Sequence, residues 1–254
     1  MHQARIAELL TPFLSTPAAI SSVPRHSSPG QRPGEEPAVL SPTQLQHIST
    51  YIDILLRWNA HINLTAIRDP EQIVTRHFGE SLFAALHLFP GFSTVPPVTS
   101  VVKDLALADV GSGAGFPGIP IQLWAPDITL TLIESNHKKA TFLREVARAL
   151  TLTDINIQNT RAQDLPKDAT NDSPTGAAAS PQTFDMVTLR AVERFDDILP
   201  TAASLLRPEG RLALLIGSSQ QAIAEATLPR ISWNESIPIP QSRSRILLIG
   251  TRKA

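Results

Sequence analysis

The segment Asp109-Val110-Gly111-Ser112-Gly113-Ala114-Gly115 follows a short apolar run and leads into a helical stretch. Its three glycines let the backbone turn sharply and leave room for a ligand to approach the main chain. In open α/β sheets, ligands bind at the carboxyl ends of the strands, where such turns lie. A dinucleotide fingerprint, G-x-G-x-x-G, would need glycine at position 116, where Phe116 stands. The turn therefore predicts a cofactor without a pyrophosphate, and S-adenosylmethionine fits that description.

Outward from this turn, short apolar runs alternate with helical stretches. We predict strands at residues 105–110, 129–134, 155–159, 184–189, 212–216, 231–236 and 245–250. We predict helices between them at 118–124, 136–150, 195–207 and 218–227. Such alternation is typical of a mostly parallel sheet with helices on both faces. Because no helix separates the last two strands, we expect one antiparallel strand. The predicted fold is α/β, the Rossmann-like seven-stranded sheet of class I S-adenosylmethionine methyltransferases.

The N-terminal part of the chain is predicted to be helical. Residues 4–14 carry apolar side chains at helical spacing. Ser41-Pro42 is a helix start signal ahead of an amphipathic stripe at 42–58. Asp69-Pro70 repeats that signal, with a glutamine placed to complete a capping box, so a further helix is expected to reach Phe89.

Shifts in composition predict the domain organisation. A short helix at 1–14 is followed at 15–40 by a stretch rich in proline, serine and glycine, which predicts a flexible linker. We expect a helical unit at 41–98 and a methyltransferase domain at 99–254. A second polar stretch at 168–181 is interpreted as a flexible insertion.

Polar residues follow the next two predicted strands at the same edge of the sheet. Glu134 ends the strand after the glycine turn, where an acidic side chain commonly binds ribose hydroxyls. A surface charge or helix cap is the simpler alternative. Ala162 and Gln163 follow the third strand, where their backbone groups could contact an adenine edge, and Asp164 could accept from its amino group. An ordinary polar loop explains that segment equally well.

Arg190 follows the fourth predicted strand, where the methyl acceptor should lie. Enzymes that methylate exocyclic amino groups usually carry Asn/Asp-Pro-Pro-aromatic there, whereas this chain reads Thr188-Leu189-Arg190-Ala191. A guanidinium suggests a phosphate or a purine face as partner, with a structural salt bridge as the alternative. The chain has no cysteine, which argues against thiolate-dependent methylation at pyrimidine carbon 5 and excludes Cys-ligated zinc.

The overall charge gives no sign of a nucleic-acid partner, because the formal net charge is −1 and the isoelectric point is about 6.7. Residues 137–148 and 230–254 are locally basic, which fits either phosphate contacts or solvated faces. No apolar run approaches the roughly 18 residues that span a bilayer. We therefore expect a cytoplasmic protein with no membrane partner and no metal.

Several segments, taken together, resemble the bacterial RsmG (GidB) family of 16S rRNA guanine-N7 methyltransferases. The resemblance runs from about residue 42 to residue 217. It is carried by Trp58-Asn59, Asn63-Leu64-Thr65-Ala66-Ile67-Arg68-Asp69-Pro70, Arg76-His77, Asp109–Pro120, Glu134-Ser135, Lys138-Lys139, Phe142-Leu143, Arg161 and Arg190-Ala191. Because the helical motifs and the cofactor motifs occur in the family's order, the combination is highly specific.

The resemblance implies a site and a partner. Its cofactor pocket would be lined by Gly111, Phe116, Ala162, Gln163 and Arg190. Glu134 stands where the family usually has Asp, and Gly113 of the turn completes the predicted set. Arg190 is also the candidate catalytic residue, and the partner would be 16S rRNA of the small ribosomal subunit. Guanine N7 carries a lone pair and no proton, so the chemistry needs positioning and no general base.

The sequence departs from the family's pattern at two positions. Leu189 replaces a usual serine, and Ile216 replaces a usual lysine, whose loss could weaken a contact to RNA phosphate. Two other hypotheses therefore stay open. The chain could methylate a small molecule or a protein, or it could be a non-catalytic module that binds S-adenosylmethionine or a nucleotide and docks on the ribosome.

Overall fold

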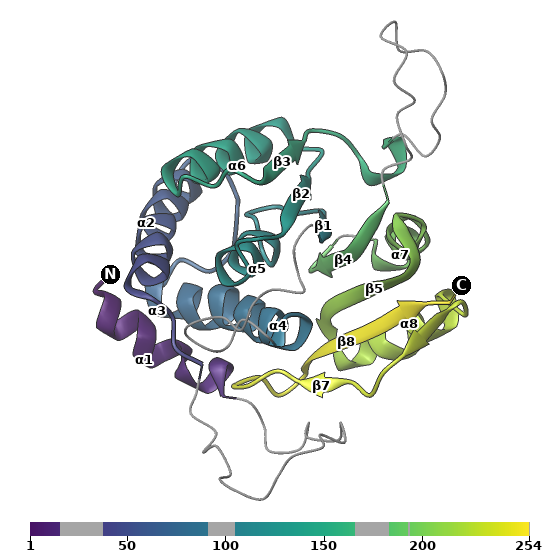
Figure 1. Ribbon diagram of the computed structural model, residues 1–254. Helices are drawn as coiled ribbons and strands as arrows, with labels where there is room; N and C mark the ends of the chain where they lie inside the picture. The colour runs from purple at the N-terminus through teal and green to yellow at the C-terminus, as the bar shows by residue number, and fades with distance from the viewer. Residues whose placement is uncertain (16–37, 91–104, 166–182, 193, 254) are drawn as a thin grey trace, which may run out of the picture.

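The computed structural model describes residues 1–15, 38–90, 105–165, 183–192 and 194–253. These residues form an eight-stranded sheet in the order β3-β2-β1-β4-β5-β8-β6, with a short β7 paired to β8 (Figure 1). Strands β1 to β5 pair in parallel, while β8 runs antiparallel to β5 and β6. The predicted α/β sheet with an antiparallel last strand is confirmed, with the two-residue β7 as an addition.

The strands lie close to their predicted positions. Their bounds are β1 Ala106–Val110, β2 Thr129–Ile133, β3 Ile155–Gln158, β4 Phe184–Arg190, β5 Leu206–Gly217, β6 Ile231–Trp233, β7 Ile237–Pro238 and β8 Arg245–Arg252. The helix predicted at 195–207 stops at Ser204, and β5 begins at Leu206. Pro208 explains part of this difference, because a residue that precedes proline is disfavoured in a helix.

Helices connect the strands and precede the sheet. The connecting helices are α5 (Gly118–Trp124), α6 (His137–Ala149), α7 (Phe195–Ser204) and α8 (Gln221–Thr227). The N-terminal helices are α1 (Gln3–Leu14), α2 (Pro42–Asn59), α3 (Pro70–Gln72) and α4 (Glu80–Leu88), with a π-helical segment at Ile73–Gly79. Ser41 caps α2 in a capping box with Gln44, as the start signal indicates.

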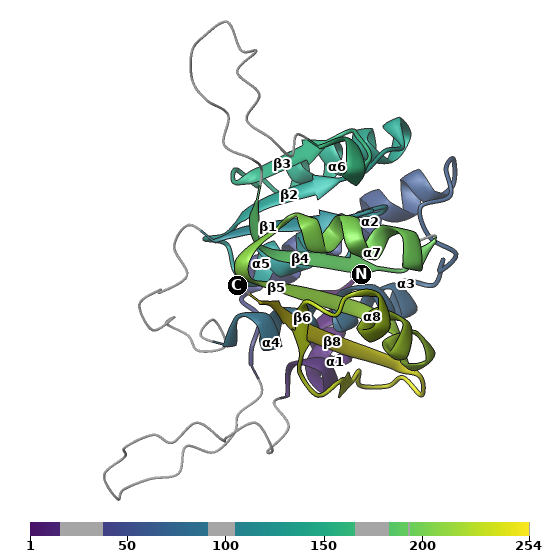
Figure 2. The ribbon, with the colours of Figure 1, turned by 90° about the vertical axis from the view of Figure 1, so that its right-hand side faces the viewer.

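The helices cover both faces of the sheet (Figure 2). Side chains alternate along β5, so Leu212 and Leu214 face one hydrophobic cluster while Ala213 and Leu215 face the other. The first cluster includes apolar residues of α7 and α8. The second includes residues of α5, α6 and the N-terminal helices, so these helices bury their apolar side chains against the sheet.

The helix predicted at 70–89 is continuous to Leu88 but contains the π-helical segment Ile73–Gly79. Such segments are rare and often occur at functional sites. Here the segment carries Arg76 and His77 to the edge of the sheet where the parallel strands end. A Cβ atom at Gly79 would lie 2.7 Å from the Phe13 ring, so glycine allows α1 to pack closely on this segment.

Part of the predicted domain organisation lies outside the described residues. This applies to residues 16–37 of the expected linker, to the expected insertion at 168–181 and to the boundary at 98/99. At the end of the linker, Ala38 and Leu40 are buried, and the Ala38 amide donates to the Leu14 carbonyl at 3.1 Å. The division into two units stays a prediction.

Candidate active site

A cavity of about 1070 Å³ opens at the carboxyl ends of the parallel strands. Open α/β sheets bind their ligands at this edge, and the volume reaches the upper end of the usual range for small-molecule sites. Every predicted site residue lines this cavity: Gly111, Gly113, Phe116, Glu134, Ala162, Gln163 and Arg190. The N-terminal part of the chain supplies a further wall, made of Leu64, Thr65, Ala66, Ile67, Arg76 and His77.

The glycine turn adopts a conformation that other residues rarely reach. Gly111, Gly113 and Gly115 have φ angles of 70°, 56° and 82°. A Cβ atom at Gly111 would lie 2.8 Å from the Val192 side chain, and one at Gly115 would collide with the Tyr51 hydroxyl. The Gly111 amide donates to the Ile133 carbonyl at 2.9 Å, which fixes the turn against the end of β2. The turn therefore presents its main chain to the cavity in a defined position.

Asp109 lies beneath the turn and has no contact with solvent. Its carboxylate accepts from the Thr188 hydroxyl at 2.8 Å and from the Gly118 amide at 3.3 Å. Burial raises the pKa of Asp109 to about 6, although these two donors lower it in part. Asp109 thus joins β1, β4 and the start of α5 and has a structural position.

Glu134 holds the turn from the side of β2. Its carboxylate accepts from the Gly113 amide at 2.9 Å and from the Asn136 amide at 2.7 Å. The Asn159 amide group donates to the Glu134 carbonyl at 2.9 Å, so β3 supports the same corner. A carboxylate has about four acceptor positions, which leaves two for ribose hydroxyls. The ribose role of Glu134 stays a prediction that this geometry allows.

The segment after β3 forms a short 3-10 turn at Ala162–Asp164. Ala162 is buried and Gln163 is exposed, and both line the cavity. Asp164 is not among the cavity-lining residues of the described chain. The interpretation of Ala162 and Gln163 as adenine neighbours stays a prediction.

Phe116 lies in a stack of rings that sequence reasoning missed. Its ring is parallel to that of Tyr51, with centroids 5.3 Å apart, and stacks on His77 at 4.8 Å. The Tyr51 hydroxyl donates to the Ala114 carbonyl within the glycine turn. Burial raises the pKa of Tyr51 well above its usual 10, so the hydroxyl keeps the proton that it donates. Helix α2 thereby supports the turn directly.

His77 also lines the cavity, and the sequence predicted no role for it. Its Nε2 atom lies 2.8 Å from the Thr65 hydroxyl, which itself accepts from the Ile67 amide. Burial, followed by the positive charges of nearby arginines, lowers the pKa of His77 to about 3. His77 is therefore neutral at physiological pH and serves as a flat aromatic surface rather than a cation.

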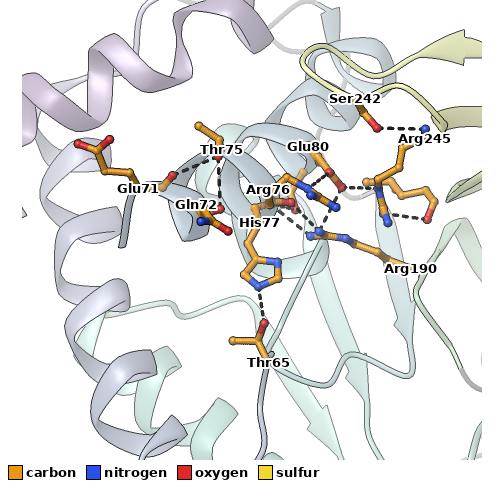
Figure 3. A network of polar contacts seen from close by, with 12 residues as sticks. Thr65, Glu71, Gln72, Thr75, Arg76, His77, Glu80, Arg190, Ser242 and Arg245 are labelled. Carbon is orange, nitrogen blue, oxygen red and sulfur yellow. Dashed lines mark hydrogen bonds and ion pairs between the residues drawn. The ribbon is translucent and has the colours of Figure 1, made fainter. Parts of the chain in front are cut away.

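Arg190 ends β4 at the cavity but is largely enclosed. Its guanidinium contacts the Glu80 carboxylate at 3.1 Å and donates to the carbonyls of Arg76 at 2.5 Å and His77 at 3.4 Å (Figure 3). Burial lowers the pKa of Arg190 to about 10, which leaves it charged at neutral pH. The salt bridge that was the structural alternative is present, and a catalytic role stays a prediction.

Ile216, the position of the family's usual lysine, does not face the cavity in the described chain. Its side chain is buried in the apolar cluster with α7 and α8, and it pairs with Ile246. A cation from the neighbouring strand occupies the cavity edge instead, because Arg245 pairs with Gly217 and lines the cavity.

This strand order, with the turn after β1 and the acid after β2, is that of the class I S-adenosylmethionine methyltransferase fold. Two solved structures share the fold. Magnesium protoporphyrin IX methyltransferase (ChlM) from Synechocystis PCC 6803, with bound S-adenosylmethionine, has a TM-score of 0.57 at 13% identity, over 82% of this chain and 97% of that one. A methyltransferase from Aquifex aeolicus has a TM-score of 0.50 at 12% identity, over 72% and 94%.

The chain belongs to the rRNA small subunit methyltransferase G (GidB) family, whose model matches residues 44–238. The curated relative from Desulfitobacterium hafniense (strain Y51) is 36% identical over 72% of this chain and 66% of its own length. That from Xanthomonas axonopodis pv. citri (strain 306) is 37% identical over 66% of each chain. The match thus spans 66% of the length of these relatives. The resemblance to the RsmG family is confirmed, and S-adenosylmethionine is the cofactor of this class.

No helix among the described residues is long and apolar enough to cross a membrane. These residues contain no group of three or more His, Cys, Asp or Glu side chains placed to hold a metal ion.

Removal of the Tyr51 hydroxyl should weaken cofactor binding. Tyr51→Phe leaves the Ala114 carbonyl without this donor, and an unpaired buried acceptor costs about 1–3 kcal/mol. We expect the Kd for S-adenosylmethionine, measured by calorimetry, to rise several-fold. Trp58→Phe is the matched control. Trp58 also belongs to α2, but its indole N–H donates to Glu145, away from the glycine turn. Equal affinities for Tyr51→Phe and wild type would contradict the support of the turn by α2.

Asp109 should make stability depend on pH. Its folded-state pKa of about 6 lies above the ordinary 3.8, so the folded protein holds this proton more tightly than the unfolded chain. Its contribution to the free energy of unfolding therefore falls as pH rises from about 4 to 6, by at most about 3 kcal/mol. Urea denaturation measures the free energy of unfolding of wild type and of Asp109→Asn. The wild-type value minus the variant value should decline over this pH range. Parallel profiles for the two proteins would exclude the raised pKa.

Proposed function

We propose that this protein transfers the methyl group of S-adenosylmethionine to N7 of a guanine in 16S rRNA. Family membership and the cavity that gathers the predicted cofactor residues support this proposal. The observation that carries it furthest is the excess of basic residues around the cavity. This excess is local, because the chain as a whole has a formal net charge of −1. The basic residues lining the cavity are Arg76, Lys139, Arg161, Arg190, Arg194 and Arg245, whereas the acidic ones are Glu134 and Asp197. Glu80, buried behind the wall, offsets one of these positive charges.

This charge distribution favours a polyanionic substrate over a small molecule or a protein. Lysine and arginine side chains provide most of the binding energy for nucleic-acid phosphates. A single-stranded RNA loop can turn a base out of its stack into a cavity, where flat side chains contact its face. His77, which is neutral and stacked on Phe116, is a wall of that kind.

The proposed mechanism depends on positioning. S-adenosylmethionine supplies an electrophilic methyl group on a positively charged sulfur. Guanine N7 would attack this methyl group with its own lone pair while the sulfur–methyl bond breaks, which leaves neutral S-adenosylhomocysteine and a positively charged 7-methylguanine. Because N7 has no proton to lose, the protein needs no general base. Asp109, buried beneath the turn, and the neutral His77 fit this scheme, because neither has to exchange a proton with the substrate. We propose that the glycine turn and Glu134 fix the cofactor, while Arg190 contacts the purine.

The proposed partner is 16S rRNA, bare or within the small ribosomal subunit, and the proposed location is the cytoplasm. The direct test is transfer of radiolabelled methyl groups from S-adenosylmethionine to bare 16S rRNA, small ribosomal subunits, total protein and a small-molecule extract. We expect label in at least one of the RNA samples. Label confined to protein or small molecules would support the alternative methyltransferase. Cofactor binding without any transfer would support a non-catalytic module.

Arg190 should be needed for methyl transfer. We expect Arg190→Ala to lower kcat/KM for RNA by at least about tenfold, which corresponds to roughly 1.4 kcal/mol. Because Arg190 also contacts Glu80, thermal denaturation of each variant must accompany the kinetics. Arg190→Lys keeps the charge but loses the planar fork, so it should retain part of the stability and little of the rate. Full activity of a folded Arg190→Ala protein would remove Arg190 from the proposed site.

A further inference from the structure

Three arginines from three separate elements contact one buried carboxylate. The Glu80 side chain is 1% exposed. Arg76 contacts it at 3.1 Å, Arg190 at 3.1 Å and Arg245 at 2.9 Å, as the convergence in Figure 3 shows. The cluster therefore holds more positive than negative charge, at one wall of the cavity.

The excess charge resides on Arg76 and Arg245. Arg190 is 7% exposed, and its fork is already engaged by Glu80 and two backbone carbonyls. Arg190 and Glu80 thus form a buried pair that neutralises itself. Arg76 and Arg245 keep 49% and 20% of their side chains exposed. Neither has a second acidic partner among the described residues, while Arg245 also donates to the Leu215 carbonyl at 3.4 Å.

Among the described residues, Glu80 is the one carboxylate that forms an ion pair with these arginines. His77 lies beside the cluster and is neutral. Asp109 directs its oxygens to Thr188 and Gly118. Glu134 lies at the β2 end of the cavity, where its carboxylate is bonded to the glycine turn. In the described part of the chain, Arg76 and Arg245 contact opposite oxygens of one carboxylate and keep positive charge toward the cavity, and planar guanidinium groups suit the oxygens of a phosphate group.

The sheet order places Arg245 away from the cofactor turn. Arg245 begins β8, which is the third strand from β1 in the order β1-β4-β5-β8. At about 4.8 Å between neighbouring strands, the backbones of β1 and β8 lie roughly 14 Å apart. Arg190 ends β4, next to β1, so Arg245 lies on the side of β4 away from the glycine turn. We expect the methyl acceptor after β4, so an anion carried by the acceptor fits this place better than the carboxylate of the cofactor.

We infer that Arg76 and Arg245 together bind one phosphodiester group of the substrate RNA next to the target guanine. This inference rests on the proposed function and adds a binding site to it. Glu80 holds the two forks at a fixed separation, so the phosphate meets a preformed site. Because both arginines serve the same phosphate, removing both should cost one phosphate contact rather than two.

The test compares wild type with the double variant Arg76→Gln/Arg245→Gln. The matched control, Arg5→Gln/Arg57→Gln, also removes two positive charges that each pair with a glutamate, from side chains that are 41% and 63% exposed and do not line the cavity. Methyl transfer to 16S rRNA is measured over a series of KCl concentrations. For the double variant, the slope of log KM for RNA against log salt should fall by about 0.7, the value for one phosphate on a single strand. Its KM should rise at least about tenfold. The control should keep the wild-type slope.

Two further measurements identify the source of the anion. Calorimetry should give the same Kd for S-adenosylmethionine in wild type and double variant. Inorganic phosphate, titrated at constant ionic strength, should raise the melting temperature of wild type and control but not that of the double variant. A double variant with the wild-type salt slope overturns the inference, and so does one that loses only cofactor affinity.

The phosphate titration also separates this inference from the proposed function, because it needs no methyl transfer. If wild type transfers no label to RNA yet phosphate still stabilises it through these two arginines, the proposed function fails and the anion site stands without its RNA assignment. If wild type methylates RNA but phosphate has no effect and the salt slope is unchanged in the double variant, the function stands and the site is wrong.

Discussion

The buried carboxylate of Glu80 joins three parts of the chain that lie far apart in sequence. It belongs to α4, while its partners come from the π-helical segment, the end of β4 and the start of β8. A buried carboxylate without partners would be strongly unfavourable, and so would the charge of Arg190, which is 7% exposed, without this carboxylate. The N-terminal helices and the far half of the sheet must therefore come together for any of these charges to be buried. The wall of the cavity opposite Glu134 depends on this cluster.

A second connection links the same helices to the cofactor turn. The rings of Tyr51, Phe116 and His77 form a continuous stack, and Phe78 meets two of them edge-on. Gly115 permits this arrangement, because any side chain there would occupy the place of the Tyr51 hydroxyl. One glycine of the turn thus serves packing within the protein, in addition to ligand access. The N-terminal part of the chain therefore both lines the cavity and supports the glycine turn.

The features that the sequence predicts well are those with local causes. The strands follow from short apolar runs, the start of α2 from Ser41-Pro42, and the turn from its glycines. The position of Glu134 at a strand end was also predictable, because parallel strands end at one edge of the sheet. These local patterns were sufficient to predict the fold and to bring every predicted site residue to one cavity.

The features that could not be predicted depend on contacts between distant residues. Tyr51 has the spacing of an ordinary core residue of α2, and only the folded chain brings it to Ala114. The spacing of Arg76 and Glu80 hints at an ion pair within a helix, but Arg190 and Arg245 are added by the sheet. The side chain of Ile216 lies in the apolar cluster, and Arg245 pairs with the next residue, Gly217. The sequence could not show this, because it depends on the pairing of β5 with β8.

The central claim concerns the atom that receives the methyl group. Its most direct test is to digest 16S rRNA methylated by this protein and to identify the modified nucleoside by mass spectrometry. The positively charged product 7-methylguanosine, from a single position, is the result that a site without a general base predicts. A methyl group on an exocyclic amine or on carbon 5 of a pyrimidine would contradict it, because the segment Thr188-Leu189-Arg190-Ala191 differs from the motif of amine methylation and the sequence has no cysteine.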